Sequence, residues 1–510
     1  LSHTAPIELA QTAGGTQPFW SPDGTQIAFF ADGKLKKIDL QGSPPQAICD
    51  APSPRGGAWG PDGKIVFSGS FRTGLEIVDA AGGAPSPLTK LDEARHEKSH
   101  RWPVFLPGGG HLLFVAQTSE AGAKDDASTI EALSMSTGAR TRLIAANSSP
   151  LYSPEGYLLF WREGALRGIR FDARTLAVSG NVFPVASAVG LDANELAYAT
   201  VSADGTLVFL PGTIAMRSTL GIVDRAGRRV GTVAESVLVE GGLDLSHDGT
   251  RLAVGITAAG ARDTDIWIYD LARGTSGPLT FEEGGDRYPV WSTGDTHVLY
   301  ANDGRNDGVL YRRSADGRGT LEQVASTASG LWSYGLSRDG TWLVAGIVTG
   351  PTSFDLMRYD IGSGKTTPLV QSPFDDVEGA LSPDEKWLAY SSDHTGRREV
   401  YVRSLDGDTG RWQISTQGGG APAWRADGRE LYFVTAQGQL MAVDVQAAGA
   451  FRHSPPRMLF EAIFNNGEAY DNGRFYAPMP DGQRFVVATL KERTTSLLTL
   501  VTNWTTGAGK

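Results

Sequence analysis

Two histidines and a glutamate near residue 100 have the spacing of a zinc-peptidase motif. The stretch RHEKSHRWPVFLPGGG (95–110) contains His96, Glu97 and His100 in the order H-E-x-x-H. On a helix, this order places two imidazoles on one face to bind zinc, with the glutamate as general base. Here the pentad ends just before a Trp-Pro strand, which leaves room for about one helical turn, and no third ligand follows on a second helix. We therefore interpret the pentad as a polar loop between two strands.

Other catalytic motifs are incomplete or absent. DIGSGKTTP (360–368) has Gly364, Lys365 and Thr366 in the order of a phosphate-binding loop, but Tyr359 stands where the first glycine is required. The chain contains no G-x-S-x-G elbow, no H-R-D and no D-F-G, so neither an α/β-hydrolase peptidase nor a kinase domain is present in it. These observations favour a protein without catalytic activity.

The elements that would position any site form one repeated unit. FWSPDGTQIAFF, LDLSHDGTRLAV and YGLSRDGTWLVA are three of eleven instances, and their turns recur roughly every 45 residues, the period of a four-stranded propeller blade. Asp-Gly supplies the positive φ of a tight hairpin, and eight of the eleven units carry Asp at this position, which indicates a structural role. Third and fourth strands follow, as in DIWIYDLARG (265–274) and SGPLTF (276–281). The sequence therefore predicts an all-β chain of eleven four-stranded blades.

The ends of the chain suggest how these blades are divided. PIELAQTA (6–13) is a lone outer strand, and SLLTLVTNW (496–504) is the last strand of the final unit. If TLGIVD (219–224) is the third strand of the fifth unit, the N-terminal strand completes that blade, and RRVGTV (228–233) completes the final one. This assignment predicts two tandem β-propellers, with about five blades in residues 1–224 and about six in residues 225–510.

Composition excludes several classes of protein. The net charge of −11 provides no basic surplus for nucleic acid. The single cysteine excludes an internal disulfide framework but leaves the compartment open. We find no apolar run of 18 residues or more and therefore expect no membrane span. We interpret the start LSHTAPIELA as processed or trimmed rather than as a signal peptide.

The repeats resemble the TolB-like, WD-type propeller repeats of bacterial proteins over essentially the whole chain. DIWIYDLARGTSGPLTFEEGGDRYPVWS and RWQISTQGGGAPAWRADGRELYF also look like the extracytoplasmic C-terminal regions of acidobacterial-type serine/threonine protein kinases. The resemblance implies a periplasmic or otherwise extracytoplasmic sensor or interaction domain, tethered to a membrane-anchored signalling protein.

Three hypotheses about function follow. The first is a non-catalytic sensor or interaction module that binds a protein, small molecule or glycan in a propeller funnel, with no cofactor, although Ca²⁺ is possible. The second is a propeller-type glycoside hydrolase or polysaccharide lyase, with Asp192 and Glu195 facing His100 and Arg101 across the funnel. The third is an assembly platform that binds proteins on the propeller faces.

The predicted binding site of the second propeller lies in the segments that precede its inner strands. Side chains from these loops would converge on the propeller axis and form an aromatic-lined, mostly acidic ring, suited to a cationic or polyhydroxylated ligand. Its residues are Glu240, Asp286, Arg287, Tyr288, Trp332, Tyr334, Asp375, Asp376, Glu378, Tyr470 and Asp471. We expect such loops to contribute little to the core.

Overall fold

The structure is a computed structural model of the 510-residue chain. The residues that it describes are 9–12, 14–31, 33–118, 128–162, 164–187, 189–191, 194–210, 217–258, 263–302, 308–327, 331–348, 354–407, 410–435, 437–446, 451–462, 473–490 and 498–507. They form two compact units, a first unit of residues 1–215 with 495–510 and a second unit of residues 216–494.

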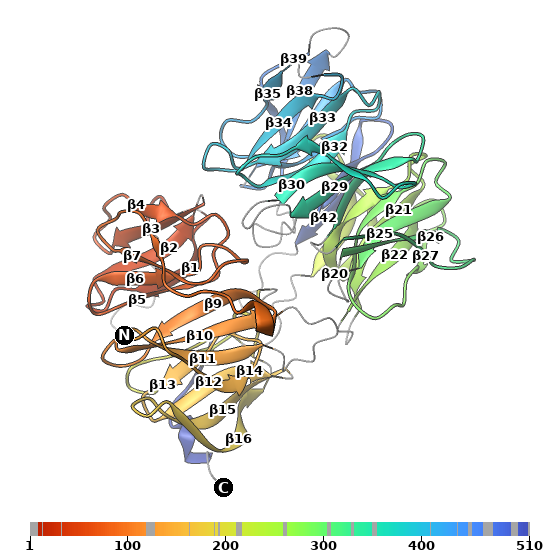
Figure 1. The fold of residues 1–510 in the computed structure, drawn as a ribbon. Helices are drawn as coiled ribbons and strands as arrows, with labels where there is room; N and C mark the ends of the chain where they lie inside the picture. The colour runs from red at the N-terminus through yellow and green to blue at the C-terminus, as the bar shows by residue number, and fades with distance from the viewer. Residues whose placement is uncertain are drawn as a thin grey trace. The chain divides into compact units, whose positions relative to one another are not determined.

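The first unit consists of antiparallel sheets, drawn from red to yellow in Figure 1. Four of its sheets have four strands each. They are β1 (Thr16–Trp20), β2 (Gln26–Ala31), β3 (Lys34–Asp39) and β4 (Gln46–Asp50); β5 (Gly57–Trp59), β6 (Lys64–Phe67), β7 (Glu76–Asp79) and β8 (Ser86–Pro87); β9 (Glu97–Phe105), β10 (His111–Thr118), β11 (Thr129–Ser134) and β12 (Arg140–Ala145); and β13 (Leu151–Ser153), β14 (Tyr157–Arg162), β15 (Ala165–Asp172) and β16 (Ala177–Ser187). A further sheet contains β17 (Ala199–Val201), β18 (Leu207–Phe209) and the C-terminal β43 (Thr499–Val501).

The second unit has the same construction. Its three four-stranded sheets are β24 (Asp286–Trp291), β25 (His297–Asn302), β26 (Gly308–Ser314) and β27 (Glu322–Thr327); β28 (Trp332–Leu336), β29 (Trp342–Val348), β30 (Phe354–Asp360) and β31 (Thr366–Val370); and β32 (Asp376–Leu381), β33 (Trp387–Ser392), β34 (Glu399–Ser404) and β35 (Arg411–Gln413). Another contains β36 (Gly420–Trp424), β37 (Glu430–Val434) and β38 (Gln439–Gln446), and β38 also pairs with β39 (Arg452–His453) and β40 (Arg457–Glu461). The seven-stranded sheet runs β23 (Thr275–Pro278), β22 (Thr264–Asp270), β21 (Arg251–Thr257), β20 (Arg229–Leu245), β19 (Ser218–Asp224), β42 (Arg484–Leu490) and β41 (Tyr476–Pro478).

The predicted all-β, four-stranded architecture is confirmed, and the first strand of each sheet lies at the centre of its unit. In the second unit, β20 contacts β24, and the contacts continue through β28, β32, β36 and β41 back to β20. In the first unit, β5 contacts both β1 and β9. The core fills the space between neighbouring sheets, where for example the rings of Phe30 and Phe67 lie 6.5 Å apart. The N-terminal ends of the first strands therefore gather at one end of each unit.

Neither helical segment seen in the described residues, η1 (Glu93–Arg95) or η2 (Trp504–Gly507), could cross a bilayer.

The recurring Asp-Gly turns are structural, as the sequence predicts. In the first turn, the Ser21 hydroxyl donates to Asp23 at 2.6 Å, and the same carboxylate accepts the Thr25 amide at 3.1 Å. These bonds lower the pKa of Asp23, and Gly24 adopts a φ of 70°. Ser246 and Asp248 repeat the serine–aspartate bond at 2.6 Å. Each carboxylate thus organises its own hairpin.

The strand exchange at the chain ends differs from the predicted one. TLGIVD does not complete the fifth unit, because β19 pairs with β42 from Ser218↔Leu490 to Asp224↔Arg484. Instead β43 pairs with β18 and supplies the third strand of that sheet, so the second unit is inserted into the first (Figure 1). RRVGTV does extend the final blade, because the start of β20 pairs with β19. Residues 6–8 of the predicted N-terminal strand lie outside the described residues, and the division into five and six blades stays a prediction.

Candidate functional sites

From Glu97 onward the H-E-x-x-H pentad lies in extended backbone, and there its interpretation as a polar loop is wrong. His96 ends the short helix η1 in a left-handed conformation with a φ of 53°, and Glu97 begins strand β9. Glu97 and His100 are 7% and 0% exposed, whereas His96 is exposed, so only part of the motif is solvated. His96 is exposed before strand β9 and His100 is buried within it, so the two imidazoles do not face a common site. The geometry is therefore not that of a zinc peptidase.

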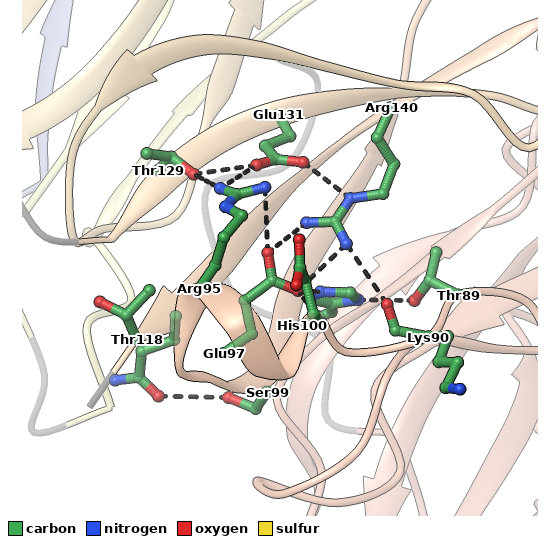
Figure 2. Close-up of polar contacts among 12 residues, drawn as sticks. Thr89, Lys90, Arg95, Glu97, Ser99, His100, Thr118, Thr129, Glu131 and Arg140 are labelled. Atoms are coloured by element: carbon green, nitrogen blue, oxygen red, sulfur yellow. Dashed lines mark hydrogen bonds and ion pairs between the residues drawn. The ribbon is translucent and has the colours of Figure 1, made fainter. Parts of the chain in front are cut away.

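Glu97 belongs to a buried ion-pair network (Figure 2), which we call the Glu97 network. Arg140 Nη2 lies 2.5 Å from one oxygen of Glu97, and Arg140 Nε lies 2.8 Å from Glu131. Arg95 also contacts both carboxylates, at 3.2 Å and 2.6 Å. Burial alone would raise the pKa of Glu97, but hydrogen bonds from His100 and Arg140 hold it well below its usual range. The two carboxylates, whose side chains are fully buried, are thus neutralised by two guanidinium groups.

His100 completes this network. Its Nε2 lies 2.9 Å from Glu97, and its Nδ1 lies 2.7 Å from the Thr89 hydroxyl. A neutral ring with its proton on Nε2 satisfies both contacts. Burial lowers the pKa of His100, which favours that neutral form. With a neutral histidine the network carries two negative and two positive charges, and we infer that it clamps β9, β11 and β12 together.

Glu195 is a further carboxylate that the first unit holds firmly. It accepts hydrogen bonds from Gln117 at 3.0 Å to each oxygen and from Asn147 at 2.6 Å, and Arg101 lies 3.3 Å away. Of the four residues predicted for a carbohydrate site, the structure therefore brings Arg101 and Glu195 together. His100 points into the Glu97 network, and Asp192 lies outside the described residues.

The predicted ring of the second unit is largely buried. Asp286, Trp332 and Asp376 are the first residues of β24, β28 and β32, so they belong to strands rather than to mouth loops. Asp286 and Asp376 are 0% and 1% exposed, and Trp332 packs edge-on against Phe354 at 4.9 Å. The expectation that these positions contribute little to the core is therefore wrong. Tyr334, Asp375 and Glu378 are buried too, Glu240, Arg287 and Tyr288 are partly exposed, and Tyr470 and Asp471 lie outside the described residues.

Burial also changes the charge of this ring. Desolvation raises the pKa of Asp286 to about 7 and that of Asp375 to about 6. Asn302 donates to Asp286 at 2.7 Å, and Ser372 donates to Asp376 at 2.7 Å. Part of the predicted negative charge is therefore protonated near neutral pH.

Arginines interleave with the remaining carboxylates. Arg287 lies 3.3 Å from Glu240, and Arg398 lies 3.7 Å from Glu378. Arg474 Nη2 lies 3.9 Å from Asp244. Sequence reasoning missed Arg398 and Arg474, although Arg474 lies only three residues after the predicted Asp471. The ring is therefore a mixed-charge surface rather than an acidic one.

A bulge recurs on the first strands of both units. Gln17, Trp102, Tyr288, Glu378 and Ala421 all have φ between 50° and 58°, and each lies where the pairing of first and second strands is interrupted. Bulges re-aim side chains, and they are common beside functional sites. A sequence signal was present, because each of these residues precedes a proline or a glycine.

Two of these bulged residues bond the neighbouring sheet. Gln17 Oε1 accepts the Gly56 amide at 2.7 Å, and Glu378 Oε2 accepts the Ala421 amide at 2.7 Å. The polar side chains at the strand ends are thus fixed from sheet to sheet.

Within the described residues, no group of three or more His, Cys, Asp or Glu side chains is placed to hold a metal ion, and Ca²⁺ binding stays a prediction.

Comparison with known proteins yields relatives of limited extent. No family model matches the chain. The uncharacterized protein Atu1656 of Agrobacterium fabrum (strain C58) is 25% identical over 158 residues, which are 28% of this chain and 49% of that protein. The uncharacterized peptidase YuxL of Bacillus subtilis (strain 168) is 31% identical over 116 residues, 22% of this chain and 16% of that protein. The chain thus spans less than half the length of either relative.

Similar solved structures include bacterial TolB proteins. A TolB structure from Agrobacterium tumefaciens is 20% identical, with a TM-score of 0.42, over 54% of this chain and 98% of that one. TolB from Acinetobacter baumannii is 15% identical, with a TM-score of 0.38, over 59% and 78% of the two chains. At these identities the likeness concerns the fold alone, and the resemblance to kinase-associated regions stays an expectation.

Proposed function

We propose that this protein is a non-catalytic binding module that recognises a protein or small ligand at the ends of its inner strands. In this proposal it is the extracytoplasmic part of a larger signalling protein, a location that rests on the sequence resemblance. The observation that carries the proposal is the way in which the carboxylates at these strand ends are held.

Glu378 illustrates this arrangement. Its Oε2 accepts the Ser391 hydroxyl at 2.5 Å and the Ala421 amide at 2.7 Å, and Arg398 lies 3.7 Å away. A carboxylate that accepts several hydrogen bonds is fixed in position. Glu378 is itself 7% exposed, so it would act by fixing the strand ends that a partner contacts. Glu195 is held in the same manner in the first unit.

The carbohydrate-active alternative has one observation in its favour. A glycosidase needs one carboxyl that is protonated near neutral pH and a second carboxylate roughly 5–9 Å from it. Burial raises the pKa of Asp286 to about 7, as a general acid requires. Asp286 is nevertheless 0% exposed, so a substrate could not reach it without a rearrangement.

Binding and turnover can be measured with the same compounds. The intact chain would be screened against glycan and peptide panels by thermal shift and calorimetry, with parallel assays for hydrolysis and elimination. We expect binding without turnover. Because the site is buried, conservative changes are appropriate: Glu378→Gln should abolish binding, whereas Glu322→Gln on the outer strand β27 should not. Turnover that is lost in Glu195→Gln or Asp286→Asn would instead establish the enzyme.

A further inference from the structure

One arginine side chain spans the centre of the second unit. Arg474 precedes β41, and its Nη2 donates to the carbonyl oxygen of Tyr334 in β28 at 3.4 Å. In the closed ring of first strands, β20 and β24 lie between β41 and β28 on one side, and β36 and β32 lie between them on the other. The two strands are therefore opposite each other, and the guanidinium crosses the axis that they surround.

The guanidinium of Arg474 is held more loosely than its backbone. Its carbonyl oxygen accepts the Leu243 amide at 2.9 Å, which fixes the main chain. Among the described residues, the side-chain anion paired with it is Asp244, 3.9 Å from Nη2, and the two side chains are 26% and 21% exposed. A long and partly solvated ion pair holds its two side chains only weakly. The side chain can therefore leave this position while the strand stays in place.

Building on the proposed function, we propose that this centre is a binding site for the guanidinium group of a partner, such as an arginine side chain. The carbonyl of Tyr334 and the carboxylate of Asp244 are the acceptors, and Arg474 is the resident group that the partner displaces. A planar guanidinium can bond a carbonyl and a carboxylate at the same time, since it carries five donors in a fixed fork.

Replacing the resident arginine tests this proposal. Arg474→Ala in the intact chain should bind N-acetyl-arginine methylamide at least tenfold more tightly than the native protein in calorimetry. The neutral citrulline analogue should not bind. Adding Asp244→Asn to Arg474→Ala should weaken the binding of the arginine probe at least tenfold. Arg484→Ala is the matched control, because Arg484 pairs with Asp481 in an exposed turn and should leave probe binding at the native level.

Several outcomes would overturn the proposal. In the first, Arg474→Ala folds normally by circular dichroism but binds the probe no better than the native chain does. Arg474 would then be a structural cross-link only. Equal binding of the lysine analogue would refute guanidinium recognition. If Arg474→Ala does not fold, ethylguanidinium added during refolding should restore its folding. If ethylguanidinium does not restore folding while Arg474→Lys folds, the proposal is also refuted.

The two proposals can fail separately. If Glu378→Gln abolishes partner binding but Arg474→Ala does not bind arginine, the binding module stands and this inference falls. If Arg474→Ala binds arginine but no partner binds the native chain, the proposed function falls and the guanidinium site stands.

Discussion

Removing Arg140 from the Glu97 network should strongly destabilise the first unit. Its guanidinium contacts Glu97 at 2.5 and 3.0 Å and Glu131 at 2.8 Å, and both carboxylate side chains are 0% exposed. In Arg140→Gln, only Arg95 remains to neutralise two buried carboxylates. Breaking a buried ion pair by removing one partner costs about 3–5 kcal/mol, because it leaves an uncompensated charge. We expect a loss of this size in the free energy of unfolding at pH 7.

The loss should depend on pH in a defined direction. In the native protein, the pKa of Glu97 lies below its ordinary value of 4.5, so its ionised form stabilises the fold above that pH and the contribution is lost as pH falls through the native pKa. Without Arg140, burial raises the pKa of both carboxyls, and they take up protons at a higher pH. The destabilisation should therefore be largest at neutral pH and should shrink below about pH 5.

Urea unfolding followed by fluorescence and circular dichroism, at pH 7 and at pH 4.5, measures this difference. Arg142→Gln is the matched control, because Arg142 lies on the same strand β12 but is exposed. The double variant Glu131→Gln, Arg140→Gln should recover part of the stability, since one buried charge is removed with its partner. A loss below about 1 kcal/mol, or one that is the same at both pH values, would refute the network as a buried, charged clamp.

Three further predictions concern single positions. Gly56→Ala should lower the unfolding midpoint of the first unit, because Gly56 has a φ of 87° and an added Cβ would lie 2.7 Å from the Trp102 ring; an unchanged midpoint would contradict this close approach. Asp286→Asn should stabilise the second unit at pH 8 but not at pH 4. Burial raises the pKa of Asp286 to about 7, so the native carboxyl destabilises the fold as pH rises from about 4 to 7. Thermal unfolding at both pH values checks the sign of this effect. Trp504→Ala should lower the stability of the first unit by about 3 kcal/mol, because the indole packs edge-on against Tyr157 at 5.6 Å and donates to a backbone carbonyl at 2.9 Å. In calorimetry, only one of two unfolding transitions should move to a lower temperature.

The repeat could be predicted from the sequence because its signals are local. An Asp-Gly turn and the alternation that follows it are set by residues close in the chain, as the bonds of Asp23 to Ser21 and Thr25 show. The strand exchange could not be predicted in the same way. β19 and β43 have similar apolar patterns, and which sheet each joins depends on partners more than 250 residues away along the chain.

The sites were predicted less well because burial depends on partners that sequence spacing does not reveal. A histidine and a glutamate in a polar stretch indicate an exposed loop until Arg95 and Arg140 are known to neutralise the glutamate. Asp286 and Asp376 were predicted in loops that precede the inner strands, whereas they are the buried first residues of β24 and β32. The composition of a loop reports its charges, but not which of them the fold pairs or protonates.

The two units use arginine–carboxylate pairs in different ways, and this difference indicates where recognition can occur. The carboxylates of the Glu97 network are 0% exposed, and a ligand that replaced either arginine would first have to break a clamp on which the unit depends. Arg474 and Asp244 are 26% and 21% exposed and 3.9 Å apart, so their contact is longer and its carboxylate is more exposed than in the Glu97 network. A binding site needs groups that can change partners without unfolding the scaffold. By that criterion the centre of the second unit is suited to recognition, and the Glu97 network is suited to holding a propeller together.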